Sequence, residues 1–231
     1  RTADLVAAKM EEFGIEIHRG LAKTGVVGIL NNGDGPSIGL RADMDALPLE
    51  ENNTFKYASR NPGKMHACGH DGHTAMLLGA AKHLASSKNF KGTVNFIFQP
   101  AEEQFPGGAN QMISEGVLEN PTIEKMFGQH VFPEMEVGKV GFCPGKYMAS
   151  ADEIEIYITG KGGHAALPKT YNNPIISASK LILDLEEHFS HHKDVPAVFA
   201  IGFINANGHC NVIPDKVNLK GTFRTINESF R

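Results

Sequence analysis

The sequence lacks any long apolar run. Its longest apolar stretches, residues 75–81 and 197–204, are far shorter than the roughly 20 apolar residues that a helix needs to cross a bilayer. It also lacks an excess of positive charge, because 22 Lys and Arg stand against 26 Asp and Glu, a net charge of −4. A protein without a basic field cannot hold a polyanion by counterion release. We therefore expect neither a membrane span nor a nucleic-acid partner.

Cysteine is scarce as well. The three cysteines are an odd number at irregular spacing, and they are Cys68, Cys143 and Cys210. They do not make a disulfide framework in a chain of this length, so we expect a reducing, cytoplasmic location. The composition is otherwise that of a globular chain, with 41% hydrophobic residues. Histidine is the outlier, with 11 residues, several of them close together. We therefore look for function among the histidines.

The first two thirds of the sequence alternate between short apolar runs and amphipathic stretches, which is typical of an α/β domain. Helices are predicted over residues 74–86, with Asp71 available to cap the first turn, and over residues 109–115. Strands are predicted over residues 26–30, 37–40, 94–98 and 125–127.

The pattern changes near residue 148. Residues 153–159 alternate strictly between apolar and polar side chains, as in a half-buried antiparallel strand. Asn173-Pro174 predicts the start of a helix that ends near residue 188. Two further strands are predicted over residues 197–204 and 216–223. The sequence therefore predicts two domains, residues 1–148 and residues 149–231, the second a small and incomplete α+β domain.

Polar side chains directly follow three predicted strands of the first domain. They are Asp43 and Asp45, Glu102 and Glu103, and His130. Open α/β sheets bind their ligands at the carboxyl ends of the strands. We therefore expect one edge of the sheet to collect two Asp, two Glu and one His.

Residues 66–73 hold three histidines, Cys68 and Asp71, immediately before a predicted helix. Cys68 and His70 are two residues apart in a loop and can face the same ion, and a helix start is expected to lower the pKa of a thiol. Thiolate, imidazole and carboxylate together favour zinc, and several such groups leave room for a second ion. Each residue alone has a structural explanation, but the cluster as a whole predicts a hydrolytic metal site.

The paired acids Glu102 and Glu103 can divide two tasks. One can bind metal while its neighbour takes the proton of a water molecule, and the spacing leaves open which does which.

The chain closely resembles the metal-dependent aminoacylase and carboxypeptidase clan, in particular its amidohydrolase branch of hippurate hydrolases, N-acetyl-diaminopimelate deacetylases and auxin-conjugate hydrolases. The stretches that carry this resemblance are residues 40–48, 65–73, 98–103, 160–165 and 211–214. The resemblance implies an α/β fold, with a zinc-peptidase-like mixed-sheet catalytic domain and an inserted α+β lid domain. It also implies a homodimer formed through the lid.

The same resemblance implies two divalent metal ions, zinc above all, with manganese, cobalt or nickel as alternatives. The implied metal ligands are Cys68, His70, Glu103 and His130. Glu102 becomes the general base that activates the water and protonates the leaving amine. Asp45 orients a metal ligand, as a carboxylate beside an imidazole can do.

Three residues of the second domain also match the family. His164 matches the lid histidine that reaches a partner's active site and stabilises the tetrahedral oxyanion. Asn211 and Arg224 match positions that hold the substrate's carbonyl or carboxylate, and an arginine suits a carboxylate because its fork accepts both oxygens.

Family members are longer than this chain, and their last metal-binding histidine follows the lid. No residue of this sequence can be offered for that ligand, so we expect a fragment or a truncated form, and the start without an initiator methionine agrees with this.

The predicted function is a metallo-amidohydrolase that cleaves the amide of a small N-acyl amino acid or a related conjugate. One alternative is a truncated homologue that acts as a metal-binding or dimerising module. Another is a hydrolase with Cys68 as the nucleophile and His70 or His130 as its base.

Overall fold

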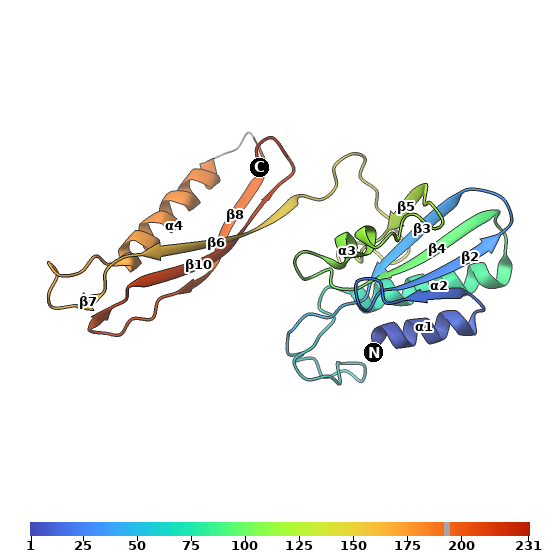
Figure 1. The fold of residues 1–231 in the computed structure, drawn as a ribbon, viewed down its shortest axis with the longest axis horizontal. Helices are drawn as coiled ribbons and strands as arrows, with labels where there is room; N and C mark the ends of the chain where they lie inside the picture. The colour runs from blue at the N-terminus through green and yellow to red at the C-terminus, as the bar shows by residue number, and fades with distance from the viewer. Residues whose placement is uncertain (192–194) are drawn as a thin grey trace. The chain divides into compact units, whose positions relative to one another are not determined.

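The computed structural model describes residues 1–191 and 195–231. The chain forms two compact units, Arg1–Gly138 and Lys139–Arg231, and each is described here by itself (Figure 1). Among the described residues, no helix is both long enough and apolar enough to cross a membrane.

The first unit is built on a mixed five-stranded sheet with the order β1-β2-β4-β3-β5. The strands are β1 (Glu16–Arg19), β2 (Val26–Asn32), β3 (Ser37–Asp43), β4 (Gly92–Gln99) and β5 (Lys125–Gly128). β1 and β4 are antiparallel to β2, whereas β3 is parallel to both of its neighbours, β4 and β5. The carboxyl ends of β3, β4 and β5 therefore meet at one edge.

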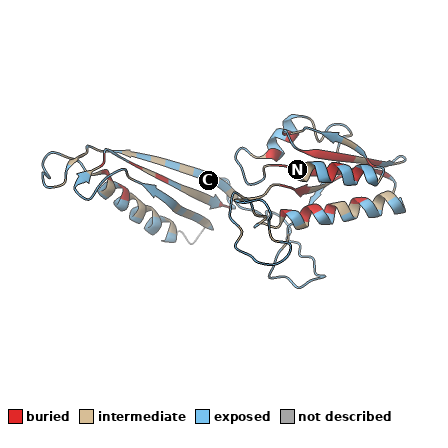
Figure 2. Ribbon diagram, turned by 90° about the horizontal axis from the view of Figure 1, so that it is seen from below, coloured by how far each residue is buried: buried red, intermediate tan, exposed pale blue. Residues whose placement is uncertain are grey.

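Helices cover both faces of this sheet. They are α1 (Thr2–Glu12), α2 (His70–Ser87) and α3 (Gly108–Ser114). Val6 of α1 and Leu77 of α2 pack into one core with Phe96 of β4. Ile97, the next residue of β4, packs with Met112 of α3 in a second core. The central strand β4 is buried at every position because it is covered on both sides, and Figure 2 shows the buried residues gathered in the sheet and on α1 and α2.

All four strands and both helices predicted in this unit are present, but two details of the prediction are wrong. The helix α2 begins at His70, with Gly69 as its N-cap at φ 86°, and no side chain caps it. Asp71 instead accepts a hydrogen bond from the amide of Gly72. The edge strand β1 was missed, because its four mostly exposed residues show no apolar alternation.

The second unit is an antiparallel sheet with the order β6-β10-β8, a short β7-β9 ladder and one helix. Its elements are β6 (Ser150–Thr159), β7 (Gly163–His164), α4 (Pro174–His191), β8 (Ala197–Asn205), β9 (Val212–Ile213) and β10 (Lys216–Thr225). Ala178 of α4 packs against Val217 and Leu219 of the central strand β10. Asn173 accepts a hydrogen bond from the amide of Ile175, as predicted for the start of this helix.

Gly108 fixes the loop between β4 and α3, which carries Glu102 and Glu103. Its amide donates to the carbonyl of Ala101 at 2.9 Å, and a Cβ at this position would lie 1.9 Å from the carbonyl oxygen of Pro100. We predict that Gly108→Ala lowers the free energy of unfolding by about 1–3 kcal/mol, because the loop must shift to admit the methyl group.

The matched control is Gly79→Ala in α2, where a Cβ would meet nothing within 4 Å. This change should be neutral, or should raise stability by about 0.5–1 kcal/mol, as alanine does in a helix. Urea unfolding of both variants measures the difference. Equal stability of the two would contradict the tight closure of the loop.

Candidate metal centre

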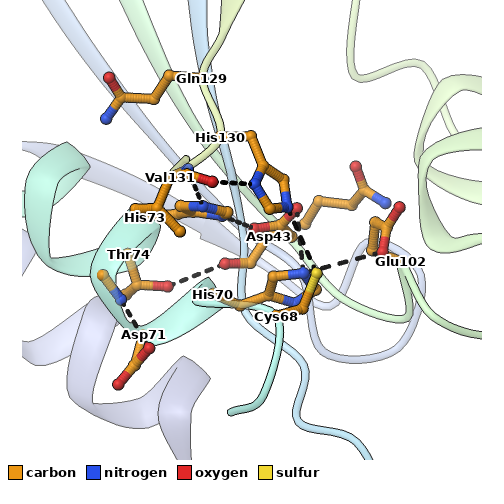
Figure 3. A network of polar contacts seen from close by, with 12 residues as sticks. Asp43, Cys68, His70, Asp71, His73, Thr74, Glu102, Gln129, His130 and Val131 are labelled. Atoms are coloured by element: carbon orange, nitrogen blue, oxygen red, sulfur yellow. Dashed lines mark hydrogen bonds and ion pairs between the residues drawn. The ribbon is translucent and has the colours of Figure 1, made fainter. Parts of the chain in front are cut away.

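The metal centre is assembled at the edge where β3, β4 and β5 end. β3 ends at Asp43, and the chain leads on to Asp45. The loop after β4 carries Glu102 and Glu103, and His130 follows β5. The start of α2 brings Cys68 and His70 to the same edge, as Figure 3 shows for the side chains labelled there.

Three overlapping groups of side chains lie close enough together to hold a divalent ion. They are Cys68, His70 and His130; His70, Glu102 and Glu103; and Asp43, His70 and His73. Within each group, the candidate ligand atoms lie within 4.8 Å of one another. His70 is common to all three groups, so it lies at the centre of the site.

His70 is oriented for an ion. Its Nδ1 lies 2.9 Å from the carbonyl oxygen of Asp45, so Nδ1 donates and Nε2 keeps its lone pair. Nε2 is buried and lacks a hydrogen-bond partner among the described residues. It lies 3.6 Å from Asp43 Oδ2, 3.8 Å from Glu102 Oε2 and 3.9 Å from Glu103 Oε1. A buried acceptor nitrogen that faces three carboxylates lacks only a cation. The residues therefore fit a divalent metal ion.

Asp45 holds both His70 and the loop that carries Glu103. Its backbone carbonyl fixes His70, and its carboxylate Oδ2 accepts a hydrogen bond of 3.0 Å from the amide of Glu103. Asp45 thereby connects the imidazole at the centre of the site to the loop of the paired acids.

Cys68 is a thiol in surroundings that oppose its ionisation. Burial first, then a hydrogen bond with Glu103 and the negative charges of Glu103 and Glu102, raise its pKa to about 11. The expectation that the helix start lowers this pKa is therefore wrong, because burial and the carboxylates outweigh it. The thiol lies 3.4 Å from Nε2 of His130.

Two buried residues of the site, Asp43 and His73, belong to the clusters expected from the sequence, but no specific role for either of them followed from it. His73 Nδ1 lies 2.6 Å from Asp43 Oδ1, and His73 Nε2 accepts a hydrogen bond of 2.9 Å from the amide of Val131. Burial alone would raise the pKa of Asp43, but the hydrogen bond from His73 and the charge of Arg41 hold it below its usual value. The available signal was a charged residue at the end of a buried strand, because a buried charge needs a partner.

In the second unit, the structure brings His164 and Asn211 together. β7, which ends at His164, pairs with β9, and the amide of Ala165 donates to the carbonyl of Asn211 at 3.0 Å. His164 Nδ1 accepts a hydrogen bond of 3.1 Å from the amide of Ala166. In the neutral ring the proton therefore resides on Nε2, which can donate to an oxyanion.

Arg224 lies toward the other end of the sheet. It pairs with Ala151 of β6 and Val198 of β8. Because β10 begins at Lys216, the strand separates Arg224 from the β7-β9 ladder by roughly 26 Å at about 3.3 Å per residue. The structure does not bring Arg224 beside Asn211 within one chain.

Comparison with known proteins gives the family. Residues 39–221 match Peptidase family M20/M25/M40, and the chain belongs to this family. It is 46% identical over 233 residues to a hippurate hydrolase of Campylobacter jejuni, a match that covers 100% of the chain and 60% of that relative. It is 40% identical over 236 residues to an N-acyl-L-amino acid amidohydrolase of Geobacillus stearothermophilus, which covers 100% of the chain and 63% of the relative.

A solved structure agrees with this assignment. The crystal structure of a Bacillus subtilis protein, described as a dinuclear metal binding peptidase from the M20 family, matches with a TM-score of 0.77 and 39% identity. The match covers 100% of this chain and 59% of the other. The predicted resemblance and fold class are confirmed, and the chain spans about three fifths of the length of these relatives.

The raised pKa of Cys68 can be tested by alkylation. In a Cys143→Ser/Cys210→Ser background treated with a chelator, the rate of reaction with iodoacetamide should rise with pH toward a midpoint near 11, because only the thiolate attacks. Added Zn²⁺ should protect the residue. The control is the Cys68→Ser/Cys210→Ser variant, which retains only the exposed Cys143. A midpoint below pH 8 for Cys68 would contradict the electrostatics described here.

Proposed function

We propose that this chain carries a large part of the active site of a metal-dependent amidohydrolase that cleaves the amide bond of N-acyl amino acids or related small conjugates. The observation that carries the proposal is the buried, unpartnered Nε2 of His70, which faces the carboxylates of Glu102 and Glu103. The printed names of the hippurate hydrolase and the N-acyl-L-amino acid amidohydrolase support the substrate class.

Cys68, His70, Glu103 and His130 are the proposed ligands of two divalent ions. The mixture of sulfur, imidazole and carboxylate favours zinc over magnesium or calcium. The Bacillus subtilis neighbour, described as dinuclear, supports the number of ions. Bound ions would polarise the amide carbonyl and acidify the attacking water.

Glu102 is the proposed general base. Glu103 is held at its amide by Asp45 and its side chain is 25% exposed, whereas the side chain of Glu102 is 41% exposed. The better fixed carboxylate suits a ligand, and the more accessible one suits proton transfer. Glu102 takes the proton of the water and later delivers it to the departing nitrogen, so its carboxylate is regenerated.

The lid residues support a homodimer. His164 with its Nε2 proton and the neighbouring Asn211 are suited to hold an oxyanion or a carbonyl, and Arg224 is suited to a carboxylate. A small substrate cannot span the roughly 26 Å that the strand rise places between them. We propose that the second unit forms the dimer, so that the three residues serve active sites from different chains, and that the protein works in the reducing cytoplasm.

Glu102→Gln tests the proposed base. The variant keeps the shape of the side chain but cannot take a proton, so kcat for hydrolysis of N-acyl amino acids should fall by about 10²–10⁴-fold. The metal content should stay at the wild-type value. Glu11→Gln on the exposed side of α1 is the control and should match the wild type. Turnover of Glu102→Gln equal to wild type would overturn this role.

The contact between Cys68 and His130 favours one competing function, a cysteine hydrolase, because the sulfur lies 3.4 Å from an imidazole nitrogen. Metal removal separates the two mechanisms. We predict that dialysis against a chelator abolishes turnover and that Zn²⁺ restores it. Turnover that survives complete removal of metal would favour the thiol mechanism. A chain that binds metal and dimerises without any turnover would instead be a binding module.

A further inference from the structure

We propose that His73 and Asp43 are positioning residues that hold His130 in place through the backbone of Val131, and that His73 does not bind the metal. The inference rests on the proposed function in one respect only, the role of His130 as a ligand. A series of hydrogen bonds runs from Asp43 at the end of β3, through His73 of α2 and the backbone of Val131, to the exposed side chain of His130 (Figure 3).

Both ring nitrogens of His73 are occupied by protein partners. A backbone amide can only donate, so the 2.9 Å contact with Val131 makes Nε2 of His73 an acceptor. Nδ1 therefore carries the proton and donates to Asp43 Oδ1 at 2.6 Å. Asp43, His70 and His73 lie close enough together to suggest a metal group, but His73 has no lone pair left for an ion.

Asp43 is a rigid anchor for this ring. It is 1% exposed. Its second carboxylate oxygen lies 2.8 Å from Nη1 of Arg41 and 3.6 Å from Nε2 of His70. The hydroxyl of Thr74 donates to the carbonyl of Asp43 at 3.0 Å, which joins the end of β3 to the first turn of α2. His73 is therefore fixed at both its backbone and its ring.

The backbone of Val131 connects the fixed ring of His73 to the side chain of His130. Its amide is held by His73, and its carbonyl accepts a 2.8 Å hydrogen bond from Nδ1 of His130. The Nε2 of His130 thus keeps its lone pair, 3.4 Å from the sulfur of Cys68. The side chain of Val131 also lies against Gly69, where a Cβ would come within 2.4 Å of Val131 Cγ2.

His130 needs such support because it is exposed and belongs to a loop. A free imidazole there would lose rotational freedom on binding an ion, and a residue that orients it in advance removes that cost. The structure also supplies matched variants. At position 73, Asn keeps a donor near Asp43 but loses the acceptor for Val131, whereas the longer Gln can keep that acceptor.

The test is cobalt titration, read through the thiolate-to-cobalt absorption of Cys68. His73→Asn should weaken Co²⁺ affinity by about 10–100-fold, the usual effect of losing a group that orients a metal ligand. His73→Gln should recover part of this loss. His83→Asn, an exposed histidine on the same helix, should bind like the wild type. Equal affinities of His73→Asn and wild type would overturn the proposal.

A double-mutant cycle separates positioning from general structural damage. In a His130→Ala background, His73→Asn should cause no further loss of affinity, because the residue it positions is gone. An equal loss in both backgrounds would show that His73 acts elsewhere, as a ligand or as a structural residue, and would overturn the proposal.

A second readout needs no metal. Nitrogen NMR of the ring of His130, assigned with His130→Ala, should show a single tautomer protonated at Nδ1 in the chelator-treated protein, and a mixture in His73→Asn. A wild type that binds no cobalt would overturn the proposed function, yet the tautomer measurement would still decide the positioning role. An unchanged tautomer in His73→Asn would overturn it.

Discussion

The parallel alignment of β3 with β4 and β5 is the constraint on which the site depends. Parallel strands direct their carboxyl ends to one edge, so residues far apart in the sequence emerge side by side. Burial of β4 on both faces makes this alignment rigid, with Phe96 in one core and Ile97 in the other. The stability of the unit therefore comes mainly from the two cores around β4, and the reactive side chains lie in the loops at the edge of the sheet.

The site gathers groups that are unfavourable together without a cation. Glu102 and Glu103 approach a ring nitrogen that offers no proton, and burial and carboxylates raise the pKa of the Cys68 thiol to about 11. A divalent ion would favour the thiolate, give His70 Nε2 a partner and offset the repulsion between the acids. One explanation thus covers the unpartnered nitrogen and the raised pKa.

The parts of the fold and site that could be predicted from sequence are those with a local pattern. The apolar run of β4, the alternation in β6 and the polar residues after each strand are all visible in the chain. The partners of those residues are not. The close contact of Gly69, the N-cap of α2, with the side chain of Val131 joins residues far apart in the sequence. The pairing of His73 with Asp43 depends on β3 meeting α2. The pKa of Cys68 likewise depends on carboxylates from another loop.

The measurement that tests the central claim most directly is the metal content of the protein, purified without chelators or affinity metal, by elemental analysis. Three candidate groups share His70, but both ring nitrogens of His73 in one of them are occupied by protein partners. The two remaining groups predict about two divalent ions per chain, as in hydrolases in which two ions act on one water. A folded sample that contains no metal and still hydrolyses N-acyl amino acids would contradict the account.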